Sequence, residues 1–325
     1  MAKKIKDHVV VVTGASSGIG RATALACAEA GAHVVVIARR KELLESLAAE
    51  CRGKGVQALV FPADVTDAEA MDHIAAETVG TFGRLDAWVN NAAVIQYGRF
   101  EEVPLDEWHR VIEVNVYGTV NGARAAIPWM REQGRGVVVN VASVLSKIAS
   151  PFQSAYVTSK FAIRGLSDSI RQELSDAPGI DVVTILPGAI DTPFFQHGAN
   201  HMGLQARAPD PTIDARRVAA AIVSGIAKPR REIVVGASTK LGLANDRLAP
   251  GLTEKAAAKQ MADEQFSEEP AEPTSGNLFE PMADGDGISG GWQREGKTPA
   301  MKVVGIAALA GAAAVGVLAR SRSDE

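Results

Sequence analysis

The feature that most restricts the fold of this chain is a repeated alternation of short apolar runs with longer helical stretches. The first run, His8–Thr13, consists almost entirely of valine, which is typical of a strand buried on both faces of a sheet. Further strands are predicted at residues 32–38, 57–61, 86–89, 137–141 and 180–186, and helices at 21–30, 41–51, 67–81, 105–130 and 154–174. Because repeated βα units place their strands parallel, we expect an α/β fold with a doubly wound parallel sheet.

A glycine-rich loop, Thr13-Gly-Ala-Ser-Ser-Gly-Ile-Gly20, follows the first strand. Its glycines allow a sharp turn and a close approach of the backbone to a ligand, and the next helix presents free amides to a pyrophosphate. The spacing is GxxxGxG rather than GxGxxG, and a glycine loop alone is often only a tight turn. Strand, loop, helix and second strand together favour dinucleotide binding. The expected cofactor contacts in the loop are Gly14, Ser16, Ser17, Gly18, Ile19 and Gly20.

The end of the second strand indicates which dinucleotide is bound. An acidic residue about 20 positions after the glycines would hold the ribose hydroxyl of NAD, but Ile37-Ala-Arg-Arg40 offers none. Arg39 and Arg40 favour a 2′-phosphate. The alternative is that both arginines only open the following helix, although cations there oppose the helix dipole. We therefore expect NADP(H) rather than NAD(H), with Arg39 as the phosphate ligand.

Three side chains suited to one proton transfer lie between Ser143 and Lys160. Tyr156 and Lys160 are four positions apart, so on a helix they share one face, and the ammonium can lower the tyrosine pKa toward the range of a general base. Ser143 follows an apolar run, so its hydroxyl should lie at the carboxyl end of the sheet. A tyrosine and a lysine at this spacing also occur by chance on exposed helix faces.

Several other residues are candidates for the site because they follow a predicted strand or lie within a predicted helix. Asp64 could reach an adenine amino group or cap the helix that begins near Asp67. Asn90-Asn-Ala-Ala93 places small residues where the backbone passes a ligand. Asn115, a poor helix former, suggests a kink or a bound water, against the alternative of a satisfied core amide. Pro187-Gly188 breaks the chain where a nicotinamide could pack.

In this order and spacing, these motifs resemble the short-chain dehydrogenase/reductase family, in its single-domain branch with a Rossmann fold. The resemblance covers about Lys6–Gly236. It implies that Tyr156 is the acid/base, that Ser143 orients the substrate, that Lys160 holds the nicotinamide ribose and lowers the tyrosine pKa, and that Asn115 fixes a proton-relay water. The further cofactor contacts that it implies are Asp64, Val65, Asn91, Tyr156, Lys160, Pro187 and Thr192.

Two departures from the family pattern are visible. Ser17 stands where NADP-preferring relatives often carry a basic residue, so Arg39 alone carries most of the NADP(H) prediction. Asn-Asn-Ala-Ala also replaces the commoner Asn-Asn-Ala-Gly, a change that should be tolerated.

The composition of the chain argues against nucleic-acid-binding and metal-binding classes of protein. The net charge is −4 and no long Lys/Arg stripe occurs, so no nucleic-acid partner is expected. The six histidines lack metal-ligand spacing, so no metal is expected either. Cys27 and Cys51 lie on predicted helices without a recognisable signal peptide, which favours a reducing compartment and a cytoplasmic catalytic domain.

The residues near the motif ends are mostly apolar and predict a hydrophobic substrate. They are Val94, Ile95, Tyr97, Val144, Leu145, Ile148, Phe152, Phe194 and Phe195. We therefore expect an NADP(H)-dependent oxidoreductase that interconverts a hydrophobic alcohol and its ketone or aldehyde, as a homo-oligomer. The alternative is a nucleotide-sensing or membrane-tethered scaffold without turnover. Residues 190–211 are expected to form a substrate lid.

The last third of the chain differs in composition. We expect a catalytic domain at residues 1–251 and a flexible polar linker at 252–302, within which Asn277–Pro281 and Gly290–Trp292 are apolar islands that could dock on a partner or reflect chance. Val303–Ala319 carries no charge and predicts a transmembrane helix, with an oligomerisation helix as the alternative.

Overall fold

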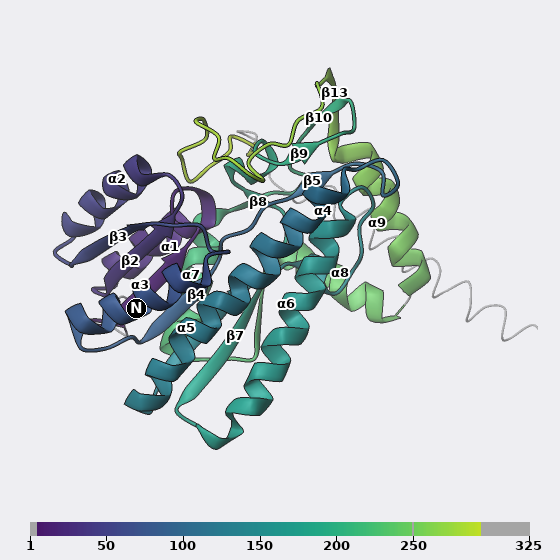
Figure 1. Cartoon of the computed structure of the whole chain (residues 1–325). Coiled ribbons are helices and arrows are strands. Elements are labelled where there is room, and N and C mark those ends of the chain that lie inside the picture. The colour runs from purple at the N-terminus through teal and green to yellow at the C-terminus, as the bar shows by residue number, and fades with distance from the viewer. Residues whose placement is uncertain (1–4, 249, 294–325) are drawn as a thin grey trace, which may run out of the picture.

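A seven-stranded parallel sheet forms the centre of the protein in the computed structural model, which describes residues 5–248 and 250–293 (Figure 1). Its strands follow the order β12-β7-β6-β4-β1-β2-β3, and every neighbouring pair is parallel. The expected doubly wound fold is therefore confirmed. The strands are β1 (Val9–Thr13), β2 (His33–Ala38), β3 (Ala58–Pro62), β4 (Ala87–Asn90), β6 (Gly136–Val141), β7 (Ile180–Pro187) and β12 (Glu232–Val235).

Helices cover both faces of the sheet. One face packs against α1 (Gly18–Glu29), α2 (Lys41–Arg52) and α7 (Ala215–Ala227). The other packs against α3 (Ala68–Phe82), α4 (Leu105–Ile112), α5 (Gly118–Gln133) and α6 (Ser154–Glu173). Within β1, Val10 and Val12 join the first core and Val9 and Val11 the second, so the strand is apolar at every position because both of its faces are buried.

The long helix expected at residues 105–130 is interrupted. A π-helical turn, Glu113–Tyr117, separates α4 from α5. Asn115 lies in this turn, and its side chain bonds to the backbone of Val94 and to the hydroxyl of Ser159. The helix is therefore irregular at Asn115, and π-helical turns of this kind often occur near functional sites.

Short elements surround the carboxyl edge of the sheet. Three small two-stranded sheets pair β5 (Gln96–Tyr97) with β9 (Ala199–Asn200), β8 (Ile190–Asp191) with β11 (Ile213–Asp214), and β10 (Leu204–Ala206) with β13 (Phe266–Pro270). Among the described residues, 3-10 turns at Val144–Ser146 and Pro193–Phe195 also lie at this edge, whereas a third, Leu174–Asp176, connects the end of α6 to the start of β7. Two further helices, α8 (Ala237–Leu248) and α9 (Pro250–Glu264), pack on each other.

The prediction of a flexible linker at residues 252–302 is wrong for the part that the structure describes. Residues 252–264 belong to α9, and β13 pairs with β10. Residues 276–292, which we call the C-terminal strap, dock on the body of the protein, with Leu278 fully buried. Hydropathy misses this segment because only a few apolar side chains are placed on the core and the other contacts use backbone groups. The boundary expected at residue 251 therefore falls inside α9.

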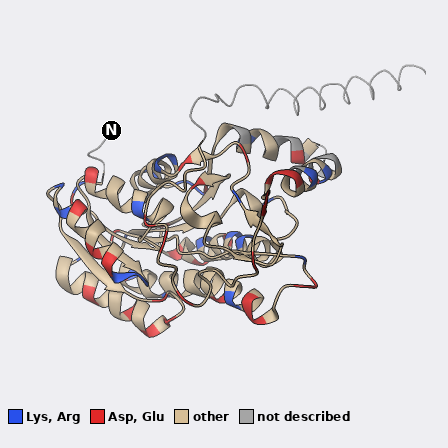
Figure 2. Ribbon diagram, turned by 90° about the horizontal axis from the view of Figure 1, so that it is seen from above, with Lys and Arg blue, Asp and Glu red and all other residues tan. Residues whose placement is uncertain are grey.

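The remaining C-terminal predictions are not decided by the structure. Within residues 5–248 and 250–293, no helix is both long and apolar enough to cross a bilayer. The helix expected at 303–319 lies outside these residues and stays a prediction. Figure 2 shows that Lys and Arg positions are interspersed with Asp and Glu positions along the described elements.

Leu278→Ala is expected to weaken the docking of the strap by about 2–4 kcal/mol, because it leaves a cavity at a buried position. Phe279→Ala is the matched control, since Phe279 is 44% exposed, and it should change docking by less than about 0.5 kcal/mol. Amide hydrogen exchange over residues 276–292 measures both effects. Equal exchange in the two variants would show that the segment is a linker after all.

Candidate active site

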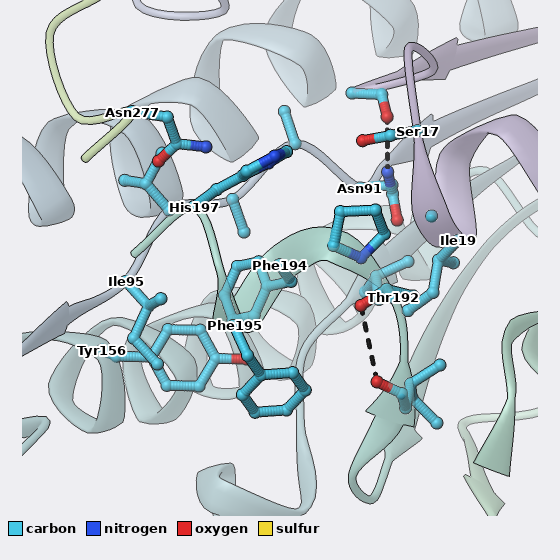
Figure 3. Close-up of a pocket in the computed structure, with 18 of the residues that line it drawn as sticks. Ser17, Ile19, Asn91, Ile95, Tyr156, Thr192, Phe194, Phe195, His197 and Asn277 are labelled. Carbon is cyan, nitrogen blue, oxygen red and sulfur yellow. Dashed lines mark hydrogen bonds between the residues drawn. The ribbon is translucent and has the colours of Figure 1, made fainter. Parts of the chain in front are cut away.

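A cavity of about 310 Å³ opens at the carboxyl edge of the sheet (Figure 3). It is lined from several strand ends, as expected where a parallel sheet binds a ligand. The predicted site residues that line it are Gly14, Ser16, Ser17, Gly18, Ile19, Arg39, Asp64, Val65, Asn91, Ser143, Tyr156, Lys160, Pro187 and Thr192. Gly20 and Asn115 do not line it. The fold thus brings most of the predicted site to one place.

The glycine loop is fixed by close packing against the end of β4. Gly14 has a φ of 65°, and a Cβ at this position would lie 2.8 Å from the Cα of Ala92. A Cβ on Gly20 would overlap the carbonyl oxygen of Gly14, so Gly20 serves the packing of the loop from beneath. The side-chain amide nitrogen of Asn91, Nδ2, donates to the Thr13 carbonyl at 2.9 Å. These contacts hold the loop and β4 in one arrangement.

Asp64 lies at the end of the cavity nearest Arg39. Its carboxylate accepts hydrogen bonds from the amide and hydroxyl of Thr66 at 3.0 and 2.8 Å and forms an ion pair with Arg110 at 2.6 Å. Burial raises the pKa of Asp64, but the bonds from Thr66 and Arg110 outweigh it and lower the pKa below its ordinary value. The alternative that Asp64 caps the helix is wrong, because Asp67 caps α3 by accepting from the Ala70 amide.

Ser143, Tyr156 and Lys160 converge at the other end of the cavity. Ser143 follows β6, and its hydroxyl accepts from the Leu145 amide at 3.1 Å. The Lys160 ammonium lies 5.3 Å from the centroid of the Tyr156 ring and donates to the Val141 carbonyl at 3.0 Å. Lys160 is only 2% exposed. The α6 helix therefore presents both side chains to the same space, as their spacing predicts.

The electrostatics of this group differ from the expectation. Burial raises the pKa of Tyr156 to about 12, although an interaction with the Ser143 hydroxyl opposes the rise. Burial also lowers the pKa of Lys160 to about 7. The predicted lowering of the tyrosine pKa by Lys160 is not seen in this structure, because the loss of water around the phenol dominates.

Asn115 lies behind the cavity rather than on its wall. Its Oδ1 accepts from the Val94 amide at 2.8 Å, and its Nδ2 donates to the Val94 carbonyl at 3.0 Å and to Ser159 at 2.9 Å. The alternative of a satisfied core amide therefore describes its side chain. A role in holding a proton-relay water stays a prediction.

Apolar side chains form the wall beside Tyr156, whose ring centroid lies 5.6 Å from that of Phe194. Six of the nine predicted pocket residues line the cavity, namely Val94, Ile95, Val144, Leu145, Phe194 and Phe195. Tyr97, Ile148 and Phe152 do not. The sequence reasoning missed the lining residues Pro209, Met261, Gln265, Asn277, Pro281 and Met282. All but Pro209 belong to the segment predicted as a linker, and the apolar island at 277–281 was its one visible signal.

A doubly wound sheet with a cavity at its carboxyl edge is the architecture of many dinucleotide-binding proteins. Comparison with family profiles narrows this class, since residues 8–202 match the family described as short chain dehydrogenase. The match covers more than half of the chain, which therefore belongs to the short-chain dehydrogenase/reductase family of oxidoreductases.

Individual relatives agree with this assignment. An uncharacterized oxidoreductase of Bacillus subtilis, YxnA, is 37% identical over 331 residues, which cover 98% of this chain and 93% of that protein. A short-chain dehydrogenase from Streptomyces avermitilis is 32% identical with a TM-score of 0.66, covering 79% of this chain and 97% of that one. An alcohol dehydrogenase from Thermococcus sibiricus, solved with 5-hydroxy-NADP, is 28% identical with a TM-score of 0.62, covering 70% of this chain and 95% of that one.

Lys160→Met is expected to stabilise the fold by about 1–3 kcal/mol near pH 7, because it removes a buried amine at the loss of one hydrogen bond. The pKa of Lys160 in the folded protein, about 7, lies below its ordinary value of 10.5. The buried lysine therefore does not lower the free energy of unfolding above about pH 10.5, and it lowers that free energy increasingly as the pH falls to about 7. Thermal unfolding near pH 7 and near pH 9.5 measures the difference.

The exposed Lys41→Met is the control for this experiment and should show no such trend with pH. A gain from Lys160→Met that is as large near pH 9.5 as near pH 7 would contradict the assigned pKa.

Proposed function

We propose that this member of the family is an NADP(H)-dependent oxidoreductase that interconverts a hydrophobic alcohol and its ketone or aldehyde. The observation that carries the proposal is the meeting of Ser143, Tyr156 and Lys160 with the glycine loop in one cavity. A proton-transfer group and a dinucleotide seat within one cavity are what hydride transfer to a carbonyl requires.

The residues of the cavity fit a dinucleotide. The α1 helix begins at Gly18 without a side-chain cap from Ser17. The Gly18 amide donates to the Gly287 carbonyl, and the amides that follow it carry the positive end of the helix dipole. Arg39 and Arg40 line the cavity, and within the described part of the chain neither has a carboxylate at ion-pair distance. Amides at a helix start and unpaired guanidinium groups both attract phosphate.

NADP(H) is favoured over NAD(H) by the strand end at Arg39, which offers a cation and no carboxylate to the ribose. The alcohol dehydrogenase of Thermococcus sibiricus, a relative in fold, was solved with 5-hydroxy-NADP. When bound, the nicotinamide supplies or accepts the hydride.

The chain's own residues supply the proton and the orientation. Tyr156 gives a proton to the carbonyl oxygen in reduction and takes it back in oxidation, and Ser143 holds the same oxygen. The pKa of about 12 suits Tyr156 to the donating direction, because the phenol stays protonated at neutral pH. Lys160 connects α6 to the end of β6 through its hydrogen bond to the Val141 carbonyl. Asn115 positions α6 through its hydrogen bond to the Ser159 hydroxyl.

The substrate proposal rests on the apolar wall. Ile95, Phe194 and Phe195 line the cavity next to Tyr156, and Met261 closes it from α9. These side chains favour a hydrophobic alcohol or ketone over a charged one.

Assembly and location are further proposals. Leu105, Tyr117 and Phe161 are exposed on α4, the π-helical turn and α6, which supports a homo-oligomer that covers them. Anchoring to a membrane through residues 303–319 rests on the sequence alone.

Tyr156→Phe is expected to lower turnover at least about a hundredfold while NADPH binding changes little, because only the proton donor is removed. Tyr97→Phe is the matched control: Tyr97 is buried nearby, lies outside the cavity lining, and its hydroxyl has no hydrogen-bond partner among the described residues. It should keep its activity. A Tyr156→Phe enzyme with more than about a tenth of the wild-type rate would exclude the acid/base role.

Arg39→Asp is expected to shift the ratio of kcat/KM from NADP(H) toward NAD(H) by about tenfold or more, because a carboxylate repels the 2′-phosphate and accepts from a ribose hydroxyl. Lys41→Asp makes the same change of charge at an exposed position and should leave the ratio nearly unchanged. An unchanged ratio of kcat/KM for the two coenzymes in the Arg39→Asp enzyme would mean that Arg39 does not bind the 2′-phosphate.

A further inference from the structure

The C-terminal strap lies at the top of the molecule in Figure 1, and three of its residues, Asn277, Pro281 and Met282, line the cavity. At its start, the Asn277 amide donates to the His197 carbonyl at 2.9 Å. In its middle, the Gly287 carbonyl accepts from the Gly18 amide of the glycine loop at 3.0 Å. Near its end, the Asp191 carboxylate accepts from the hydroxyl of Ser289 at 2.6 Å and from two backbone amides. The strap is therefore attached to the segment 191–197 and to the glycine loop.

The strap also holds Arg39. One terminal nitrogen of its guanidinium donates to the Asn277 carbonyl at 2.6 Å, and the other donates to the Phe279 carbonyl at 2.8 Å. These two bonds fix the plane of the guanidinium group, because both of its terminal nitrogens are held.

Arg40 is held in the same way. Its guanidinium donates to the carbonyls of Met282, Asp284 and Gly285 at 3.2, 3.0 and 3.3 Å, and to the Ser16 hydroxyl at 3.3 Å. The last bond connects Arg40 to the glycine loop. Both arginines are thus oriented by backbone groups more than two hundred residues further along the chain.

These contacts orient the charges without neutralising them. Carbonyl groups are uncharged, and the hydrogen bonds to the strap use only the terminal nitrogens. Among the described residues, no bond uses the Nε–H of either guanidinium or the second Nη2–H of Arg39, whereas the four terminal N–H groups of Arg40 are all used. Burial lowers the pKa of both guanidinium groups. Asp64 and Glu280 oppose this shift at Arg39 and Asp286 opposes it at Arg40, whereas repulsion from Arg110 on Arg39 and from Arg39 on Arg40 adds to it. Two partly buried cations at one cavity wall are stabilised by an anion that reaches both.

We propose that the C-terminal strap is part of the cofactor site, in which it positions Arg39 and Arg40 for the 2′-phosphate of NADP(H). This inference rests on the proposed function and deepens it. Asn277, Pro281 and Met282 of the strap line the same cavity as Asp64, so the strap forms a wall of the site and leaves the space beneath it open. A guanidinium held beforehand loses less conformational entropy when the phosphate binds.

The test displaces the strap without touching either arginine. A Cβ on Gly276 would overlap the His197 carbonyl, and a Cβ on Gly290 would overlap the Thr192 carbonyl. The full-length variant Gly276→Ala/Gly290→Ala should therefore undock both ends. Gly287→Ala is the matched control, because its Cβ would meet only the Ser289 carbonyl, at 3.4 Å. Gly290→Ala alone is the milder second variant, and thermal unfolding shows that each protein is folded.

The probes are adenosine 2′,5′-bisphosphate and adenosine 5′-monophosphate, titrated by calorimetry, since they differ only in the 2′-phosphate. In the undocked variant, the Kd of the bisphosphate should rise about tenfold or more, while the Kd of the monophosphate rises less than about threefold. Gly290→Ala should lie between this variant and wild type, and Gly287→Ala should match wild type.

Three results would overturn the proposal. An equal loss of affinity for both probes in the undocked variant would mean that the strap only covers the cavity. Tighter binding of the bisphosphate in that variant would mean that the strap competes with the phosphate. A wild-type protein that binds both probes equally would remove the 2′-phosphate site and the proposed cofactor preference together. If wild type prefers the bisphosphate and the undocked variant keeps that preference, only the role of the strap fails.

Discussion

The site depends on a fixed register among β4, β6 and α6, which a buried chain of hydrogen bonds holds. The Trp88 indole donates to Asn90 at 2.8 Å, Asn90 donates to Asn140 at 2.9 Å, and Asn140 donates to Ser167 on α6 at 2.9 Å. Each group finds its partner only in this register, and a slip of one residue would turn every strand side chain to the opposite face. Because α6 carries Tyr156 and Lys160, the same chain of bonds places these two side chains against the sheet edge.

Much of this arrangement could be predicted from the sequence, because its signals are local. The valine run of β1, the glycine loop and the spacing of Tyr156 and Lys160 each follow from backbone periodicity, and a parallel sheet then brings their ends together. The charge states could not be predicted in the same way. The pKa of Tyr156 depends on how much water the folded protein removes from the phenol, and that quantity belongs to the packing of residues such as Phe194 rather than to the spacing along α6.

The C-terminal segment shows a second limit of sequence reasoning. Its composition is polar, and composition predicts whether a segment can build a core of its own, not whether it can dock on an existing one. Leu278 is buried in a core made by other elements, and the carbonyl groups that hold Arg39 and Arg40 are present in every residue type. No pattern of side chains could therefore have indicated the bonds from these carbonyls to Arg39 and Arg40, although the apolar island at 277–281 was a signal of the docked segment. Arg110 was missed because its partner, Asp64, lies 46 residues away in the sequence.

The separation of Arg39 from its partners also has a consequence for synthesis of the protein. Asn277 follows Arg39 by 238 residues. At roughly 5–20 residues per second, a ribosome needs roughly 10–50 seconds to make that stretch. During this interval β1, α1 and β2 can already pack, whereas both arginines lack the backbone that orients them. A nascent or prematurely ended chain would therefore have a folded glycine loop while Arg39 and Arg40 still lack the carbonyls that orient them. If the strap positions both arginines as proposed, such a chain would bind the 2′-phosphate of a coenzyme more weakly until residues 276–292 have been made.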